Sequence, residues 1–317
     1  MKRLALVLVP VALFVVPGEL FVRLTGLDWK LLAPSLYYQG ADVEVHRASE
    51  DPSLVYELRP GASALIRGRR ITTNALGFRD KERSLAKPAG VFRVVCLGSS
   101  NTYGALVQDG ETYPARLEAL LNSRGKRRYE VWNAGVSAYN LAQSAAAAEK
   151  LAATASPDMI VIQVHSLRRR AFLLGEPFAR YFSMDPSLFE ENLRRTPLGL
   201  GRLEKALLRA SALYRAFAFA YNGRPGRSNN PLWESISPGE DALRGLAARR
   251  GKQIPIVLLY NPDYGVGVAK ELGLPSVRLD DYLPRGAGPE YREIHPPAPV
   301  YEWYARALAS ALPLPKD

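Results

Sequence analysis

Residues 91–104 read Val-Phe-Arg-Val-Val-Cys-Leu-Gly-Ser-Ser-Asn-Thr-Tyr-Gly, and this stretch decides the fold. The run Val91–Leu97 is mainly apolar and stops at a glycine, which predicts a short strand buried in a parallel sheet. Gly98 permits a tight turn off that strand, so the serine hydroxyls that follow are presented at the edge of the sheet where parallel α/β proteins place their sites. A Gly/Ser-rich loop at this place also suits phosphate binding or a plain turn.

Strands and helices alternate on the C-terminal side of this stretch. Further strands are expected at 129–132, 159–164, 254–260 and 276–279, and helices at 112–122, 141–155, 240–249, 267–272 and 299–312. Alternation of short strands with helices predicts an α/β protein with three layers and a parallel sheet in the middle.

Two regions stand apart from this alternation. Residues 27–90 carry turn signals between short segments such as Ser63–Ile66, which predicts a small β-rich preface with a hairpin. The domain at 91–317 carries an insertion at about 169–231 that is rich in Phe and Tyr, with a helix expected over 203–221. The insertion suits a lid or an acyl-binding cap, and equally an ordinary helical elaboration that buries its aromatic side chains.

The N-terminus resembles a signal anchor. Lys2 and Arg3 precede the apolar run Leu4–Val22, which is just long enough to cross a bilayer although Glu19 and two prolines interrupt it. We expect residues 1–26 to form an uncleaved, single-pass cell-membrane anchor, with residues 27–317 outside the cytoplasm. A cleaved signal peptide would give the same compartment, and a buried N-terminal helix is the third alternative.

Composition narrows the classes of function. The chain is 47% hydrophobic and 23% charged, which is typical of a globular protein. Its net charge of +11 comes from arginines in small groups without a nucleic-acid motif, so we expect no nucleic-acid partner. Cys96 is the one cysteine, it stands in an apolar run, and there is no Cys/His cluster, so an inert buried thiol and no metal or cofactor are expected. Oligomeric state is left open.

A serine needs a base before it becomes a good nucleophile, and the sequence offers one at a suitable place. His295, in Glu293-Ile294-His295-Pro296-Pro297, stands on a loop immediately before the final expected helix. A surface histidine ahead of a proline-initiated helix would look the same. Gly135 ends the second expected strand, where its backbone N–H is available to an oxyanion beside Ser100.

Taken in order, these blocks resemble the SGNH/GDSL hydrolase family, including its membrane-anchored bacterial members. The resemblance covers 91–312 and rests on Gly98-Ser99-Ser100 with Thr102 and Gly104, on Asn133-Ala134-Gly135, and on His295-Pro296. It extends to 27–90, where Arg59-Pro60-Gly61 and the run Asn74–Asp80 resemble the preface of the anchored bacterial members. It implies a flavodoxin-like α/β/α sandwich in which Ser100 is the nucleophile and His295 the base. It also implies an oxyanion hole formed by the N–H groups of Ser100 and Gly135.

Two blocks depart from the family pattern. The third block, Gly-x-Asn-Asp in the family, reads Val164-His165-Ser166-Leu167 here, so Ser166 is the remaining candidate for the third oxyanion donor. The acid three residues before the histidine is replaced by Arg292. Glu293 could orient the imidazole from two residues away, because side chains two apart in an extended segment share a side. Asp280, Asp281 and a backbone carbonyl are the alternatives.

The sequence therefore predicts a serine esterase that forms an acyl-enzyme without metal or cofactor. Its substrate would be an ester of an acylated envelope glycan, a lipid or a small molecule. The alternatives are an envelope polysaccharide O-acyltransferase and a catalytically inactive relative that binds carbohydrate.

Overall fold

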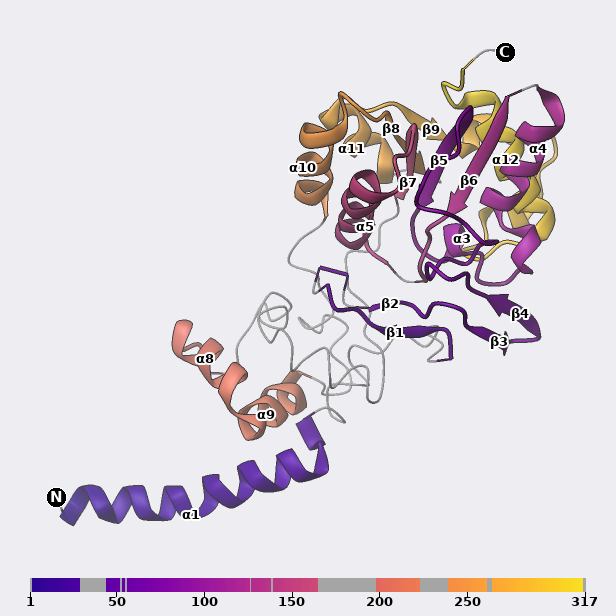
Figure 1. Ribbon diagram of the computed structural model, residues 1–317. Coiled ribbons are helices and arrows are strands. Elements are labelled where there is room, and N and C mark those ends of the chain that lie inside the picture. The colour runs from indigo at the N-terminus through magenta and orange to yellow at the C-terminus, as the bar shows by residue number, and fades with distance from the viewer. Residues whose placement is uncertain are drawn as a thin grey trace. The chain divides into compact units, whose positions relative to one another are not determined.

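The computed structural model describes residues 2–28, 44–51, 53–54, 56–125, 127–137, 139–164, 198–222, 239–260 and 264–315, with the backbone alone at a few of them (Figure 1). The chain divides into two compact units. One comprises residues 1–38 and 171–236, and the other comprises residues 39–170 and 237–317.

The larger unit is built on a five-stranded sheet in which every pair of neighbouring strands is parallel. The strand order is β6-β5-β7-β8-β9, formed by β5 (Val91–Leu97), β6 (Arg128–Asn133), β7 (Met159–Val164), β8 (Ile256–Tyr260) and β9 (Ser276–Arg278). Numbered from β5, this order is 2-1-3-4-5, the flavodoxin-like order. The predicted parallel sheet is confirmed, and the last strand ends one residue earlier than expected.

Helices cover both faces of the sheet. Val94 and Cys96 of β5 face α4 (Tyr113–Arg124) and α12 (Ala298–Ala311). Val95 and Leu97 face α5 (Leu141–Thr154), α10 (Glu240–Arg250) and α11 (Tyr264–Leu272). Each fully buried aliphatic side chain contributes about 1.5–3 kcal/mol to the free energy of folding. A one-residue slip would exchange the two faces, so this burial fixes the register. The expected three-layer sandwich is confirmed (Figure 1).

The preface forms two small antiparallel pairs, β1 (His46–Ala48) with β2 (Tyr56–Leu58) and β3 (Ser63–Ile66) with β4 (Arg69–Thr72). The β3–β4 hairpin turns through Arg67 and Gly68, whose φ angles are 48° and 75°. Positive φ at both central residues defines a type I′ turn, which matches the twist of the flanking strands. The predicted hairpin is therefore confirmed, and the preface lies at the end of the sheet where α3 (Ser100–Tyr103) begins (Figure 1).

The smaller unit contains α1 (Lys2–Thr25), α8 (Arg202–Ala210) and α9 (Ala212–Asn222). The prediction of a single helix over 203–221 is wrong, because the helix is interrupted at Ser211, which separates α8 from α9. The Glu19 carboxylate accepts hydrogen bonds from the backbone N–H groups of Ala212 (2.8 Å) and Leu213 (2.9 Å), and so caps the start of α9.

No helix within the described residues is both long enough and apolar enough to span a membrane. The anchor expected at 4–22 thus stays a prediction.

Candidate active site

Ser100 lies where the sequence predicts it, on the turn between β5 and α3. Gly98 has a φ of 153°, which only glycine adopts readily, and a Cβ there would lie 2.4 Å from Thr102 Oγ1. The turn is therefore closed by a residue without a side chain, and Ser100 follows as the first residue of α3 with 9% of its surface exposed.

A buried group of polar side chains hydrogen-bonds to Thr102 in this turn. Thr102 Oγ1 donates to Gln163 Oε1 (2.9 Å) and lies 3.1 Å from Tyr113 Oη. Burial raises the pKa of the nearby Cys96 thiol, as expected of an inert cysteine. Sequence reasoning missed Gln163, although a polar residue inside the apolar run Met159–Val164 was the available signal.

Arg79, from the preface, holds the turn from the far end of α3. Its buried guanidinium donates to the carbonyls of Tyr103 (3.1 Å), Gly104 and Val107 (2.6 Å) and pairs with Asp109 (2.8 Å). These carbonyls lie at and beyond the end of α3, where no further helical turn supplies donors, and Arg79 supplies them instead. Sequence reasoning missed this role too. A lone arginine in a loop gives no sign of its partners.

Gly135 packs directly against the serine turn. A Cβ on this residue would lie 2.5 Å from the backbone N of Tyr103 and 2.7 Å from the carbonyl carbon of Thr102, so only glycine fits. The position agrees with a role beside Ser100. Its N–H donates to Asn133 Oδ1 (3.1 Å), a partner that it would exchange for an oxyanion.

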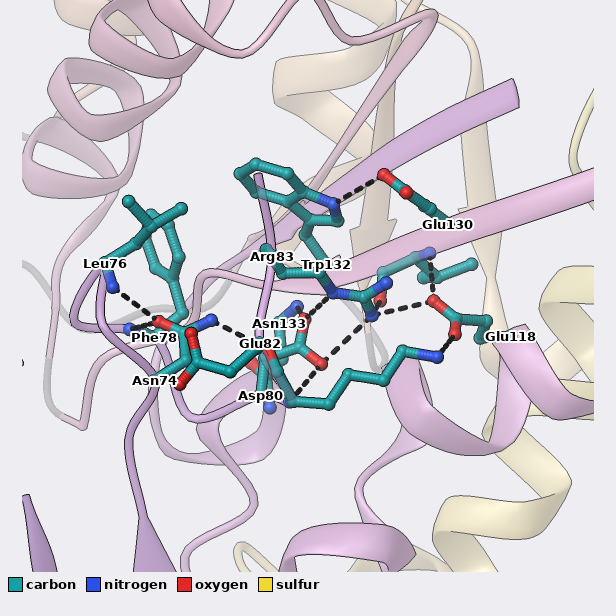
Figure 2. A network of polar contacts seen from close by, with 12 residues as sticks. Asn74, Leu76, Phe78, Asp80, Glu82, Arg83, Glu118, Glu130, Trp132 and Asn133 are labelled. Atoms are coloured by element: carbon teal, nitrogen blue, oxygen red, sulfur yellow. Dashed lines mark hydrogen bonds and ion pairs between the residues drawn. The ribbon is translucent and has the colours of Figure 1, made fainter. Parts of the chain in front are cut away.

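A charged network fixes the end of β6 that leads into Gly135 (Figure 2). Asp80 Oδ2 accepts from Arg83 Nε (2.9 Å) and from the backbone N–H of Asn133 (3.1 Å). Arg83 also donates to Glu118 Oε2 (2.7 Å) and to the Val131 carbonyl (3.0 Å). Burial raises the pKa of Asp80, and the hydrogen bond and positive charge of Arg83 oppose this shift.

His295 lies between η4 (Pro289–Arg292) and α12 and is half-buried. Its Nε2 atom is buried and has no hydrogen-bond partner in the part of the chain that the structure describes. Burial lowers the pKa of His295, and the positive charge of Arg67 at the tip of the β3–β4 hairpin lowers it further. Both effects favour the neutral imidazole, which is the form that can accept a proton.

Among the described residues, none of the other predicted site residues is hydrogen-bonded to this imidazole. No hydrogen bond among the described residues links Ser100 to His295. The Glu293 side chain is exposed and makes none with His295 either. Asp280 and Asp281 lie instead at 4.0 Å and 3.9 Å from Arg278. Ser166 lies outside the described residues, so the roles assigned to these side chains remain predictions.

With this geometry in view, known proteins can be compared. No family model matches the chain, and no curated protein matches it. Solved structures similar to it include a lipolytic protein of the G-D-S-L family from Desulfitobacterium hafniense (12% identity, 69% of this chain and 99% of that chain, TM-score 0.39). Another is the acetylxylan esterase Axe2 from Geobacillus stearothermophilus (14% identity, 71% and 95%, TM-score 0.40).

A third is LAE5, an alpha/beta hydrolase enzyme from the metagenome of Lake Arreo (18% identity, 69% and 94%, TM-score 0.39). Similarity of this degree carries no information about substrate. The parallel sheet is the one that the sequence resemblance to the SGNH/GDSL family implies, and the roles of Ser100, Gly135 and His295 stay predictions.

Proposed function

We propose that the protein is a serine hydrolase of the SGNH/GDSL type that cleaves carboxylic esters. The observation that carries this proposal is the turn after β5, where contacts of Thr102, Arg79 and Gly135 hold the backbone around Ser100 at the edge of a parallel sheet. A turn fixed in this way gives the serine a defined position from which to attack.

In the proposed reaction, Ser100 Oγ attacks the ester carbonyl while neutral His295 takes its proton. The tetrahedral oxyanion is held by the backbone N–H groups of Ser100 and Gly135, with Ser166 as the third donor. The protonated imidazole then gives its proton to the departing alcohol, and water releases the acid from the acyl-enzyme by the same steps. Candidate substrates are acyl esters of an envelope glycan, a lipid or a small alcohol.

One observation favours a second candidate, a relative that binds an acylated ligand without cleaving it. Ser100 and His295 are not hydrogen-bonded to each other among the described residues, and His295 Nε2 is unpartnered. In the hydrolase, the loop at 293–297 closes this gap when substrate binds, because catalytic hydrogen bonds often tighten only in the complex. In the binding protein the gap persists.

For localisation, we propose that residues 1–26 anchor the chain in the cell membrane with the sheet domain outside the cytoplasm. Support comes from the described part of α1, where Phe14 is 81% exposed, Leu13 66% and Leu24 77%. A row of large apolar side chains this exposed needs an apolar environment. A C-terminal reporter that functions only in the cytoplasm should be inactive.

The test of function is labelling with a fluorophosphonate, which reacts with an activated serine whatever the substrate. We expect the wild-type protein to be labelled and Ser100→Ala not to be. Ser99→Ala is the matched control, because it removes the neighbouring hydroxyl and should leave most labelling intact. A folded wild-type protein that is not labelled would rule out the hydrolase and leave the binding protein.

A further inference from the structure

A cavity of about 250 Å³ lies in the sheet domain. Its walls come from the β1–β2 pair, the loop around Leu76–Leu85, the end of β6 and helix α5, and Ser100 is not among its lining residues. We propose that this cavity binds the alkyl chain of a single-chain amphiphile whose head group is anionic, such as a medium-chain carboxylate.

The walls of the cavity favour an alkyl chain. They are lined largely by aliphatic and aromatic side chains, among them Leu54, Leu58, Phe78, Val136 and Leu151. Tyr139 also lines it, but its hydroxyl is already used, since it donates to the Tyr56 carbonyl (2.5 Å). A polar group placed against these walls would lose its water without gaining a partner, whereas a methylene chain gains burial.

Hydrogen bonds between the preface and the domain hold the cavity open. Gln143, at the start of α5, donates through Nε2 to the Leu54 carbonyl (2.6 Å), and Tyr56 Oη donates to the Ser137 carbonyl (2.6 Å). These bonds link both walls at fixed positions. The space is therefore part of the fold, and a cavity with apolar walls is a suitable site for an apolar ligand.

Charges among the lining residues favour an anionic head group. Lys150 on α5 is exposed, and no described carboxylate pairs with it. Arg47 on β1 is paired with Glu57 on β2 (2.6 Å), so these two charges cancel. The lining therefore carries one net positive charge, which a carboxylate would neutralise while its chain fills the cavity.

The position of the cavity gives such a ligand contact with the candidate active site. Ala134 and Val136, which both line it, flank Gly135 in the sequence. A bound chain would therefore rest on the segment that presents the proposed oxyanion donor. The inference goes beyond the proposed function, because binding in this cavity requires neither Ser100 nor His295.

The experiment is photo-crosslinking of the full-length protein in lipid nanodiscs with decanoic acid that carries a terminal diazirine. Labelled peptides are mapped by mass spectrometry, and unlabelled decanoate is added as competitor. We expect saturable, competed labelling on 54–58 and 147–154. Labelling of those peptides that does not saturate, or that decanoate does not compete, would overturn the proposal.

Two matched pairs of variants sharpen this test. Ala147→Met fills the cavity from α5 and should raise the half-saturating concentration by at least about tenfold, whereas Ala146→Met, on the same helix but off the lining, should not. Leu85→Trp fills the cavity from the opposite wall and serves if Ala147→Met does not fold. Unchanged labelling in both filling variants would contradict the proposal.

The head group is tested separately. Lys150→Gln should weaken labelling by the acid about two- to fivefold, and it should leave labelling by the corresponding diazirine alcohol unchanged. Equal effects on the acid and the alcohol would refute the anionic head group.

A last experiment distinguishes two possible occupants of the cavity, a free amphiphile and the acyl chain of a substrate held at Ser100. Protein pre-treated with a decyl fluorophosphonate and with a methyl fluorophosphonate should be labelled equally in the cavity. Protection by the decyl reagent alone would show that the cavity receives a chain tethered at Ser100, and a separate site would be excluded. If Ser100 proves unreactive, the proposed function fails while the labelling of the cavity still decides this inference.

Discussion

The two halves of the candidate site are held in very different ways. The serine turn is buried, and Thr102, Gln163, Arg79 and Gly135 all fix it through hydrogen bonds or direct contact. The loop at 293–297, which carries His295 and is called the histidine loop below, has Ile294 81% exposed. Among the described residues, His295 Nε2 has no hydrogen-bond partner. The fold pre-organises the serine half of the site, whereas the imidazole of the histidine half has no hydrogen-bond partner among the described residues.

The difference follows from where each half is attached. The serine turn continues directly from β5, an interior strand of the sheet with a helical layer on each face. The histidine loop is held by contacts between the segments on either side of it. Trp303 Nε1 donates to the Tyr282 carbonyl (2.7 Å), and the Tyr291 ring packs on Trp303 (5.1 Å between centroids). A loop held in this way can move its imidazole toward Ser100 at little cost to the core.

The largest expected effect is the loss of the base. His295→Ala should reduce ester hydrolysis by about 100- to 10,000-fold, the usual contribution of a general base. Hydrolysis of p-nitrophenyl acetate measures it. Because the two residues act as a unit, Ser100→Ala combined with His295→Ala should be hardly worse than Ser100→Ala alone. Additive losses would mean that the two halves never meet.

The second effect tests how firmly the serine half is held. Arg79→Met removes the guanidinium that donates to the carbonyls of Tyr103, Gly104 and Val107 and to Asp109 Oδ1, so the free energy of unfolding should fall by about 3 kcal/mol or more. Urea denaturation measures this, and fluorophosphonate labelling should fall with it. Arg70→Met, at an exposed position in the preface, is the control and should change stability by less than about 0.5 kcal/mol. Equal stabilities for the two variants would contradict the comparison.

The third effect is a shift in pH dependence on the histidine half. The charge of Arg67 disfavours the imidazolium and so lowers the pKa of His295. Arg67→Asn removes the charge yet tolerates the positive φ of the turn, so the pKa should rise and the half-maximal labelling rate should move to higher pH. Labelling measured from pH 5 to pH 8 tests this, with Arg70→Asn as control. A shift to lower pH would reverse the assigned sign.

The smallest effect is expected at Glu293. Because this carboxylate is exposed and makes no hydrogen bond with the imidazole, Glu293→Gln should slow hydrolysis by no more than about fivefold. Steady-state kinetics measure it beside Glu290→Gln. A loss comparable to that of His295→Ala would instead show that the loop closes with Glu293 on the imidazole.

The order of strands and helices and the position of the serine turn could be predicted from the sequence alone. Short apolar runs predict the parallel strands, and their alternation with helices predicts the layers, because both patterns reflect burial that is local in the chain. The serine turn and Gly135 could be predicted for the same reason, since parallel strands end at one edge of the sheet.

Only the tertiary structure decided which side chains support that edge. Gln163 reaches Thr102 across 61 positions, and Arg79 reaches Gly104 across 25. Arg67 affects His295 although most of the chain lies between them. Hydrogen bonds and charges act over distances in space, and the distances between residues remote in sequence exist only once the core has packed. The cavity beside α5 belongs to the same class, because its walls come from segments that no local pattern connects.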